Sequence, residues 1–152
     1  MLHFSKKTEY ALIAMGHMTR KGSESELITS TREVAEAFHI PYPLLGKVLQ
    51  KLAAKGLIKS VQGTKGGYVL ARHPHDISLA AVIEIFEGPW ALTDCMREER
   101  ITCPQWSGCS LKHPLAEINH KIYDLLLQTT VADLQASSPG VHSNSAAELV
   151  GV

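Results

Sequence analysis

Apolar residues in the first third of the chain recur at steps of three and four positions in three separate stretches. These stretches cover residues 4–21, 31–39 and 43–56, and the last carries a row of lysines opposite its apolar stripe. Residues three and four apart share one face of a helix, so this spacing predicts three amphipathic helices. The first of them buries Ala11, Ala14, Met15 and Met18.

Residues at the ends of these stretches predict where the helices begin and end. Ser30 and Glu33 have the spacing of a capping box, in which each side chain bonds the backbone N–H of the other residue. The segment IPYP ends the second helix, because a residue before proline avoids the helical region. Pro43 suits the first position of the third helix, and Gly56 suits the position just after its end.

The remaining pattern predicts a hairpin and two further helices. Residues 57–61 and 68–72 are strand-like and flank the glycine-rich, basic segment QGTKGG. Residues 77–88 have a helical pattern, and a helix resumes at about Leu115. We expect a mainly α fold with a small β wing, divided into residues 1–75, a helix and cysteine loop at 76–113, a helix at 114–136, and a disordered tail at 137–152.

The order of these elements is typical of a winged helix-turn-helix. In this motif the second helix of the pair enters the DNA major groove. The residues predicted to contact DNA lie at the start of the short helix, on the lysine-bearing helix and in the hairpin tip: Ser30, Thr31, Arg32, Tyr42, Pro43, Lys47, Gln50, Lys51, Gln62, Thr64 and Lys65. The alternative is a plain helix pair beside a hairpin, with lysines that only face solvent.

The charge distribution favours the DNA-binding interpretation. The 152-residue chain has 15 basic and 15 acidic residues, but residues 1–65 hold ten of the basic and five of the acidic ones, a net +5 that the rest balances. No apolar run reaches the roughly 20 residues of a membrane span, and the start lacks the apolar region of a secretory signal. We expect a cytoplasmic protein with no membrane partner.

All three cysteines lie between residues 94 and 109, as Cys95, Cys103 and Cys109. In the reducing cytoplasm such a group indicates metal binding or redox chemistry rather than disulfides. The spacing lacks the paired C-x2-C knuckles of structural zinc sites, whereas iron–sulfur clusters accept more varied spacings. Zinc and a redox-sensing thiol set remain open. A fourth ligand could come from His113, from Glu9 of a second subunit, or from Asp94.

Three stretches resemble the Rrf2 family of winged-helix transcription regulators over about residues 1–135. They are KKTEYAL, the segment LLGKVLQKLAAKGLIKSVQGTKGGYVLAR, and the three-cysteine loop. IscR and NsrR belong to this family, and EIFEGPWALTDC with the later VADL is similar to the subgroup that regulates iron–sulfur cluster assembly operons. The resemblance does not extend to two base-reading positions: Gly46 replaces an acidic residue, and Gln62 replaces an arginine.

The resemblance implies a homodimer and a cofactor. The dimer would form through the long helix that carries Leu115, Ile118, Ile122, Leu125 and Leu126. A [2Fe-2S] or [4Fe-4S] cluster would be held by Cys95, Cys103 and Cys109, with the partner's Glu9 as the first choice for a fourth ligand and His113 as the second.

The sequence therefore predicts a cluster-dependent dimeric regulator that binds a palindromic operator. We expect a repressor of redox, nitric oxide or iron–sulfur assembly genes. The alternatives are a cluster-free thiol sensor and a zinc-stabilised DNA-binding dimer. No nucleophile–base pair, phosphate loop or hydride-cofactor motif indicates an enzyme with a small-molecule substrate.

Overall fold

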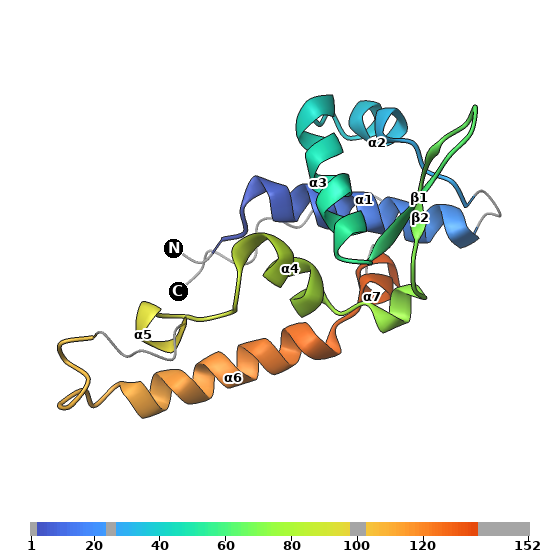
Figure 1. Ribbon diagram of the computed structural model, residues 1–152. Helices are drawn as coiled ribbons and strands as arrows, with labels where there is room; N and C mark the ends of the chain where they lie inside the picture. Colours follow the sequence, from blue (N-terminus) through green and yellow to red (C-terminus); the bar gives the residue numbers. More distant parts are fainter. Residues whose placement is uncertain (1–2, 24–26, 98–102, 137–152) are drawn as a thin grey trace, which may run out of the picture.

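The computed structural model describes residues 3–23, 27–97 and 103–136, and the tail predicted at 137–152 lies outside them. The fold is mainly helical with one two-stranded antiparallel wing, as the sequence predicts (Figure 1). Its elements, in order, are α1 (Lys6–Ser23), α2 (Thr31–Ala37), α3 (Tyr42–Ala54), β1 (Ile58–Val61), β2 (Gly67–Leu70), a 3-10 turn η1 (Pro74–Asp76), α4 (Leu79–Glu87), α5 (Asp94–Arg97), α6 (Lys112–Gln128) and α7 (Val131–Ala136).

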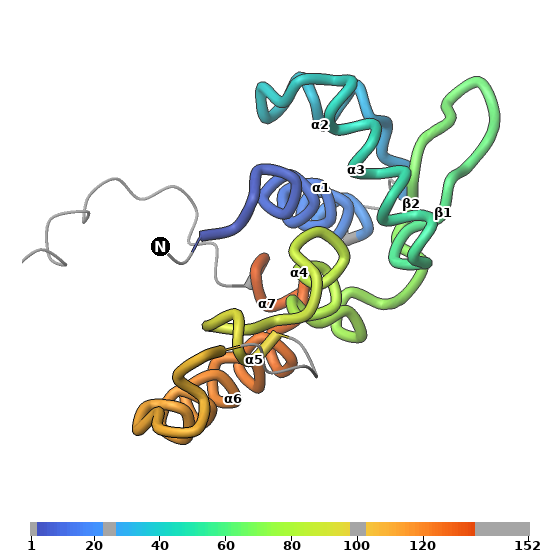
Figure 2. The backbone as a smooth tube through the Cα atoms, turned by 60° about the vertical axis from the view of Figure 1, so that its left-hand side comes forward, coloured from blue at the N-terminus to red at the C-terminus, as the bar shows by residue number. Residues whose placement is uncertain are grey.

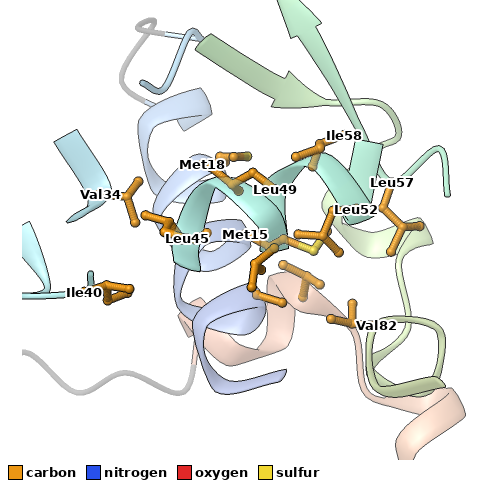
Figure 3. Packing of buried hydrophobic residues seen from close by; sticks show 14 of the residues in the cluster. Met15, Met18, Val34, Ile40, Leu45, Leu49, Leu52, Leu57, Ile58 and Val82 are labelled. Atoms are coloured by element: carbon orange, nitrogen blue, oxygen red, sulfur yellow. The ribbon is translucent and has the colours of Figure 1, made fainter. Parts of the chain in front are cut away.

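Helix α1 is the centre of the molecule. It packs against α3, α4, α7 and β2, and the face predicted to be buried is fully inside, with Ala11, Ala14 and Met15 at 0 % exposure. Figure 3 shows Met15 and Met18 meeting leucines of α3 and the strand residue Ile58. Burial of this shared apolar face fixes α3 on α1.

Both turns around α3 close in the same way. Helix α2 ends at Ala37, two residues before its predicted end, because His39 adopts a left-handed backbone (φ 53°) and Ile40 N donates to Ala35 O at 2.9 Å. After α3, Gly56 (φ 75°) occupies the equivalent position, and Leu57 N donates to Leu52 O at 3.1 Å. These are Schellman-type ends, and they confirm the role predicted for Gly56.

Helix α2 begins at Thr31 as predicted, but α3 begins one residue early and the capping box of α2 is incomplete. Helix α3 begins at Tyr42, so Pro43 is its second residue and not its first. At α2, Ser30 Oγ accepts from Glu33 N at 3.1 Å, which is half of the predicted capping box. The Glu33 carboxylate instead reaches α1, so the box is not completed and α2 is tied to α1.

The wing is bonded to a third extended segment. Strands β1 and β2 pair with Ile58 opposite Leu70 and Val61 opposite Gly67. Thr29 adds an isolated bridge to Tyr68, with N–O distances of 2.9 and 2.8 Å. The short extended piece before α2 therefore sets the angle at which the wing leaves the body.

Helix α6 lies along the opposite side of the molecule from α2 and the wing (Figures 1 and 2). It begins at Lys112, three residues before the predicted start, and packs mainly against α4. Tyr123 donates to Glu84 at 2.8 Å, and Asn119 Oδ1 accepts from Leu92 N at 2.9 Å. The one-turn helix α5 lies in the cysteine segment, where the sequence predicts no element. Within the described ranges, no helix is both long and apolar enough to cross a membrane.

Candidate DNA-binding surface and cysteine segment

A groove of about 640 Å³ joins the start of α2 to the tip of the wing. Ser30 and Arg32 line it from α2, and Thr64 and Lys65 line it from the wing. The structure thus brings together two groups of predicted DNA-contact residues that are more than 30 positions apart in sequence. Lys21 of α1 also lines the groove, although no sequence pattern predicted a role for it in DNA binding.

The predicted recognition face of α3 is open to solvent. Lys47, Gln50 and Lys51 are exposed, and Tyr42 at the start of the helix is 57 % exposed. The ammonium of Lys51 lies 5.2 Å from the ring centroid of Phe86 in α4. The predicted recognition face is therefore accessible, but the Lys51 side chain contacts Phe86 of α4.

A network of charged side chains that includes two lining residues of the groove, Lys21 and Glu33, fixes α2 on α1. Glu33 Oε1 lies 2.6 Å from His17 Nε2, and Glu33 Oε2 accepts from Lys21 Nζ at 3.0 Å. Partial burial acts to raise the pKa of Glu33, but the hydrogen bonds from His17 and Lys21 outweigh it and lower that pKa. Glu33 therefore stays ionised, and its bonds to α1 hold the first turn of α2 in place.

The three cysteines are free and half-buried. Cys95 Sγ lies 3.1 Å from Thr93 Oγ1, and the Cys103 thiol donates weakly to Gln105 at 3.4 Å. The second half of the segment rests on α6, where Lys112 Nζ lies 4.8 Å from the ring centroid of Trp106. Residues 98–102, which connect the halves, lie outside the described part of the chain.

The described residues contain no group of three or more His, Cys, Asp or Glu side chains that could already hold a metal ion. Glu9, predicted as a ligand from the partner, pairs within its own chain with Lys6 at 2.6 Å and is 41 % exposed. The hydrogen bond and charge of Glu9 raise the pKa of Lys6. His113 is exposed in the first turn of α6. Both candidates are accessible to a second subunit.

The apolar residues of α6 fall into two adjoining rows. Leu115, Ile122 and Leu126 are half-buried on the side of Asn119 and Tyr123, which faces α4. Leu111, Ile118 and Leu125 are 60 %, 46 % and 63 % exposed and stand seven residues apart. Seven residues are close to two helical turns, so these three side chains form an exposed stripe that nothing in the described chain covers. Leu111 was not among the predicted dimerisation residues, because it precedes the predicted start of the helix.

Comparisons with known proteins agree with this architecture. The family model described as Rrf2, iron-dependent transcriptional regulator, matches residues 4–137. The HTH-type transcriptional regulator NsrR of Shouchella clausii is 30 % identical over 133 residues, which cover 88 % of each chain. Among solved structures, CymR (YrzC), the global cysteine regulator of B. subtilis, aligns with a TM-score of 0.73 at 27 % identity, covering 91 % of this chain and 100 % of that one. IscR of T. potens aligns with a TM-score of 0.68 at 26 % identity, covering 95 % and 94 %.

Proposed function

Since the chain belongs to the Rrf2 family of DNA-binding transcription regulators, which are not enzymes, we propose that it is a homodimer whose DNA affinity depends on an iron–sulfur cluster. Cys95, Cys103 and Cys109 would hold the cluster. The observation that carries this proposal is that all three thiols lie in the one segment that leads from α4 to the exposed helix α6.

The donor set suits such a cluster. Thiolates are its usual protein ligands, and each of the three thiols is free and reachable from solvent. Their positions in the single protomer do not yet form a binding site, so the segment must rearrange around the group it binds. A carboxylate from the partner's Glu9 would complete the set, after breaking its ion pair with Lys6.

A bound cluster would link the two ends of the cysteine segment, in addition to the packing of α6 on α4. Helix α4 contacts both α1 and α3, so its position affects the recognition helix. Two copies joined through α6 would present two α3 helices to the half-sites of a palindrome. A coupling of about 1–3 kcal/mol, the usual allosteric range, would change DNA affinity about five- to 150-fold. Genes of iron–sulfur assembly or of the redox and nitric oxide responses are the proposed targets, in the cytoplasm.

The first experiment is to purify the protein without oxygen and to count iron, acid-labile sulfide and zinc per chain. Brown protein with about equal iron and sulfide supports the proposal, and alanine at any one of the three cysteines should then remove the stable chromophore. Full cluster content in one of these variants removes that cysteine from the ligand set. Glu9→Ala compared with His113→Ala identifies the fourth ligand by which variant changes the visible spectrum.

A cluster-free thiol regulator is the second candidate function. It is favoured by the observation that the described cysteines do not converge on a metal-holding arrangement. A colourless, metal-free protein that stays colourless after anaerobic reconstitution, and whose DNA affinity changes on oxidation of its thiols, would establish this alternative. Colourless protein with bound zinc would instead make the segment structural.

The DNA-binding surface is tested separately from the cofactor. Lys47→Gln and Lys65→Gln remove one charge each from α3 and from the wing tip, and both should weaken binding to duplex DNA. Lys121→Gln, an exposed residue on α6, is the matched control on the opposite side of the molecule. If wild type and all three variants bind duplex DNA with equal affinity, the DNA-binding surface is not formed by α3 and the wing tip.

A further inference from the structure

Helices α1, α3 and α4 meet at a small pocket that carries three lysines. Lys7 comes from α1, Lys47 and Lys51 come from α3, and Phe86 of α4 closes one side. The other lining residues are the apolar Leu44 and Val48, and no acidic residue lines the pocket. The sequence analysis predicted no role for Lys7. It lies 40 residues before Lys47, so local sequence patterns do not show that the two residues are close in space.

The size and charge of this pocket select one kind of ligand. Its volume is about 110 Å³, well below the roughly 300–1,000 Å³ of sites for organic ligands. Three lysines with like charges line so small a space, and an anion with several oxygens would offset those charges. A single phosphate group has this size and chemistry.

Phe86 gives one of the three lysines a defined place. The Lys51 ammonium lies over the Phe86 ring, 5.2 Å from its centroid, within the range of a cation–π contact. A long lysine side chain on an exposed helix face otherwise samples many rotamers. The contact restricts Lys51 to the side of the helix where Lys7 and Lys47 also lie.

We propose that the Lys7–Lys47–Lys51 pocket binds one backbone phosphate of the duplex, and that Phe86 is a positioning residue for Lys51. This inference rests on the proposed DNA-binding function and adds to it a contact from α1 and a dependence on α4. Glu87, the next residue of α4, accepts hydrogen bonds from Ser5 N at 2.9 Å and from the Thr8 hydroxyl. The last turn of α4 therefore positions both walls of the pocket, immediately before the chain enters the cysteine segment.

The phosphate contact is tested with Lys7→Gln, using a fluorescent duplex of random sequence in anisotropy titrations at several salt concentrations. Each phosphate neutralised contributes about 0.9 to the slope of log K against log salt. We expect Lys7→Gln to reduce affinity about three- to tenfold at low salt. Combined with Lys47→Gln and Lys51→Gln, it should lower that slope by about 0.9 for each pocket that contacts the duplex. Lys55→Gln, at the end of α3 and outside the pocket, removes the same charge as Lys7→Gln and should leave both affinity and slope unchanged.

The positioning role is tested by combining changes at Phe86 and Lys51. Phe86→Leu should weaken DNA binding about two- to fivefold, and Phe86→Tyr, which keeps the ring, should retain it. In a Lys51→Gln background, Phe86→Leu should have no further effect on affinity. A merely structural role for Phe86 would weaken binding equally in both backgrounds, and that result would overturn the assignment.

The outcomes separate this inference from the proposed function. If wild-type protein binds the duplex with a steep salt dependence and Lys7→Gln matches it in affinity and slope, the pocket does not hold a phosphate, while DNA binding stands. If wild-type protein binds neither random nor operator-selected duplex, in its metal-loaded or metal-free form, both proposals are wrong.

Discussion

Replacing Gly67 by alanine tests how the wing is fixed to the body. A Cβ at this position would come to 2.4 Å from Thr29 O and 2.8 Å from Thr29 C, and to 3.1 Å from Ile28 Cγ2. Two of these are backbone atoms, which cannot rotate away as a side chain can. The alanine therefore has to separate β2 from the segment that carries Thr29.

The cost follows from the bonds that this separation breaks. The Thr29–Tyr68 bridge consists of two backbone hydrogen bonds of 2.9 and 2.8 Å, and each is worth about 0.5–1.5 kcal/mol net. Loss of both costs about 1–3 kcal/mol. Replacing glycine also stiffens the unfolded chain, which offsets about 0.4–1 kcal/mol. We expect Gly67→Ala to lower the free energy of unfolding by about 1–2 kcal/mol.

Gly46→Ala is the matched control, with the opposite expected sign. Gly46 lies inside α3 with no atom within 4 Å of an added Cβ, so alanine there should stabilise the helix by about 0.5–1 kcal/mol. Urea unfolding followed by circular dichroism measures both changes. A Gly67→Ala protein at least as stable as wild type would refute the reasoning, because it would mean that the bridge tolerates the added methyl group.

Three further predictions use other parts of the molecule. Ser30→Ala removes the N-cap of α2 and should cost about 1 kcal/mol in urea unfolding; no change would show that the cap is not needed. Since the pKa of Glu33 is lowered on folding, its carboxylate stabilises the fold above its ordinary value of about 4.5, and this contribution is lost as the pH falls. Glu33→Gln should therefore flatten the decline in stability between about pH 5 and pH 3, whereas parallel curves would contradict the assignment. Ile118→Ser with Leu125→Ser should convert the expected dimer to monomer by light scattering. Leu127→Ser, two and a half turns from Ile118, should not, and an unaltered dimer in the double variant would place the interface elsewhere.

Features that depend on neighbouring residues in sequence could be predicted well. The buried face of α1, the stop at Gly56 and the hairpin each follow from spacing or from the backbone freedom of one residue, so the structure reproduces them. The end of α2 was predicted less well, because the sequence pointed to the prolines that follow. The helix ends instead where His39 takes a left-handed conformation (φ 53°) and Ile40 becomes buried. Histidine is enriched among non-glycine residues with positive φ, but such residues are uncommon, so a histidine alone does not predict the end of a helix.

Features that depend on tertiary contacts could not be predicted from local patterns. Ser30 and Glu33 have the right spacing for a capping box, but spacing gives no information about a competing partner. His17 and Lys21 of α1 offer Glu33 a hydrogen bond and a positive charge, and these replace the bond to the Ser30 backbone. The same is true of α6. Its apolar residues recur with a clear helical period, but only the packing of the helix on α4 shows which of its two apolar rows stays exposed.

The contacts of the last turn of α4 indicate that a small movement of this turn can change how the protein binds DNA. Phe86 contacts the Lys51 ammonium, and Glu87 accepts hydrogen bonds from Ser5 and Thr8 at the start of α1. Burial acts to raise the pKa of Glu87, but these hydrogen bonds outweigh it, so the carboxylate that holds α1 stays charged. A shift of this turn would separate Lys7 of α1 from Lys47 and Lys51 of α3, since the turn holds the start of α1 through Glu87 and the Lys51 side chain through Phe86. Because the cysteine segment begins only a few residues later, we expect binding of the proposed cluster there to change the phosphate contact through this turn, without moving α3 out of its place in the core.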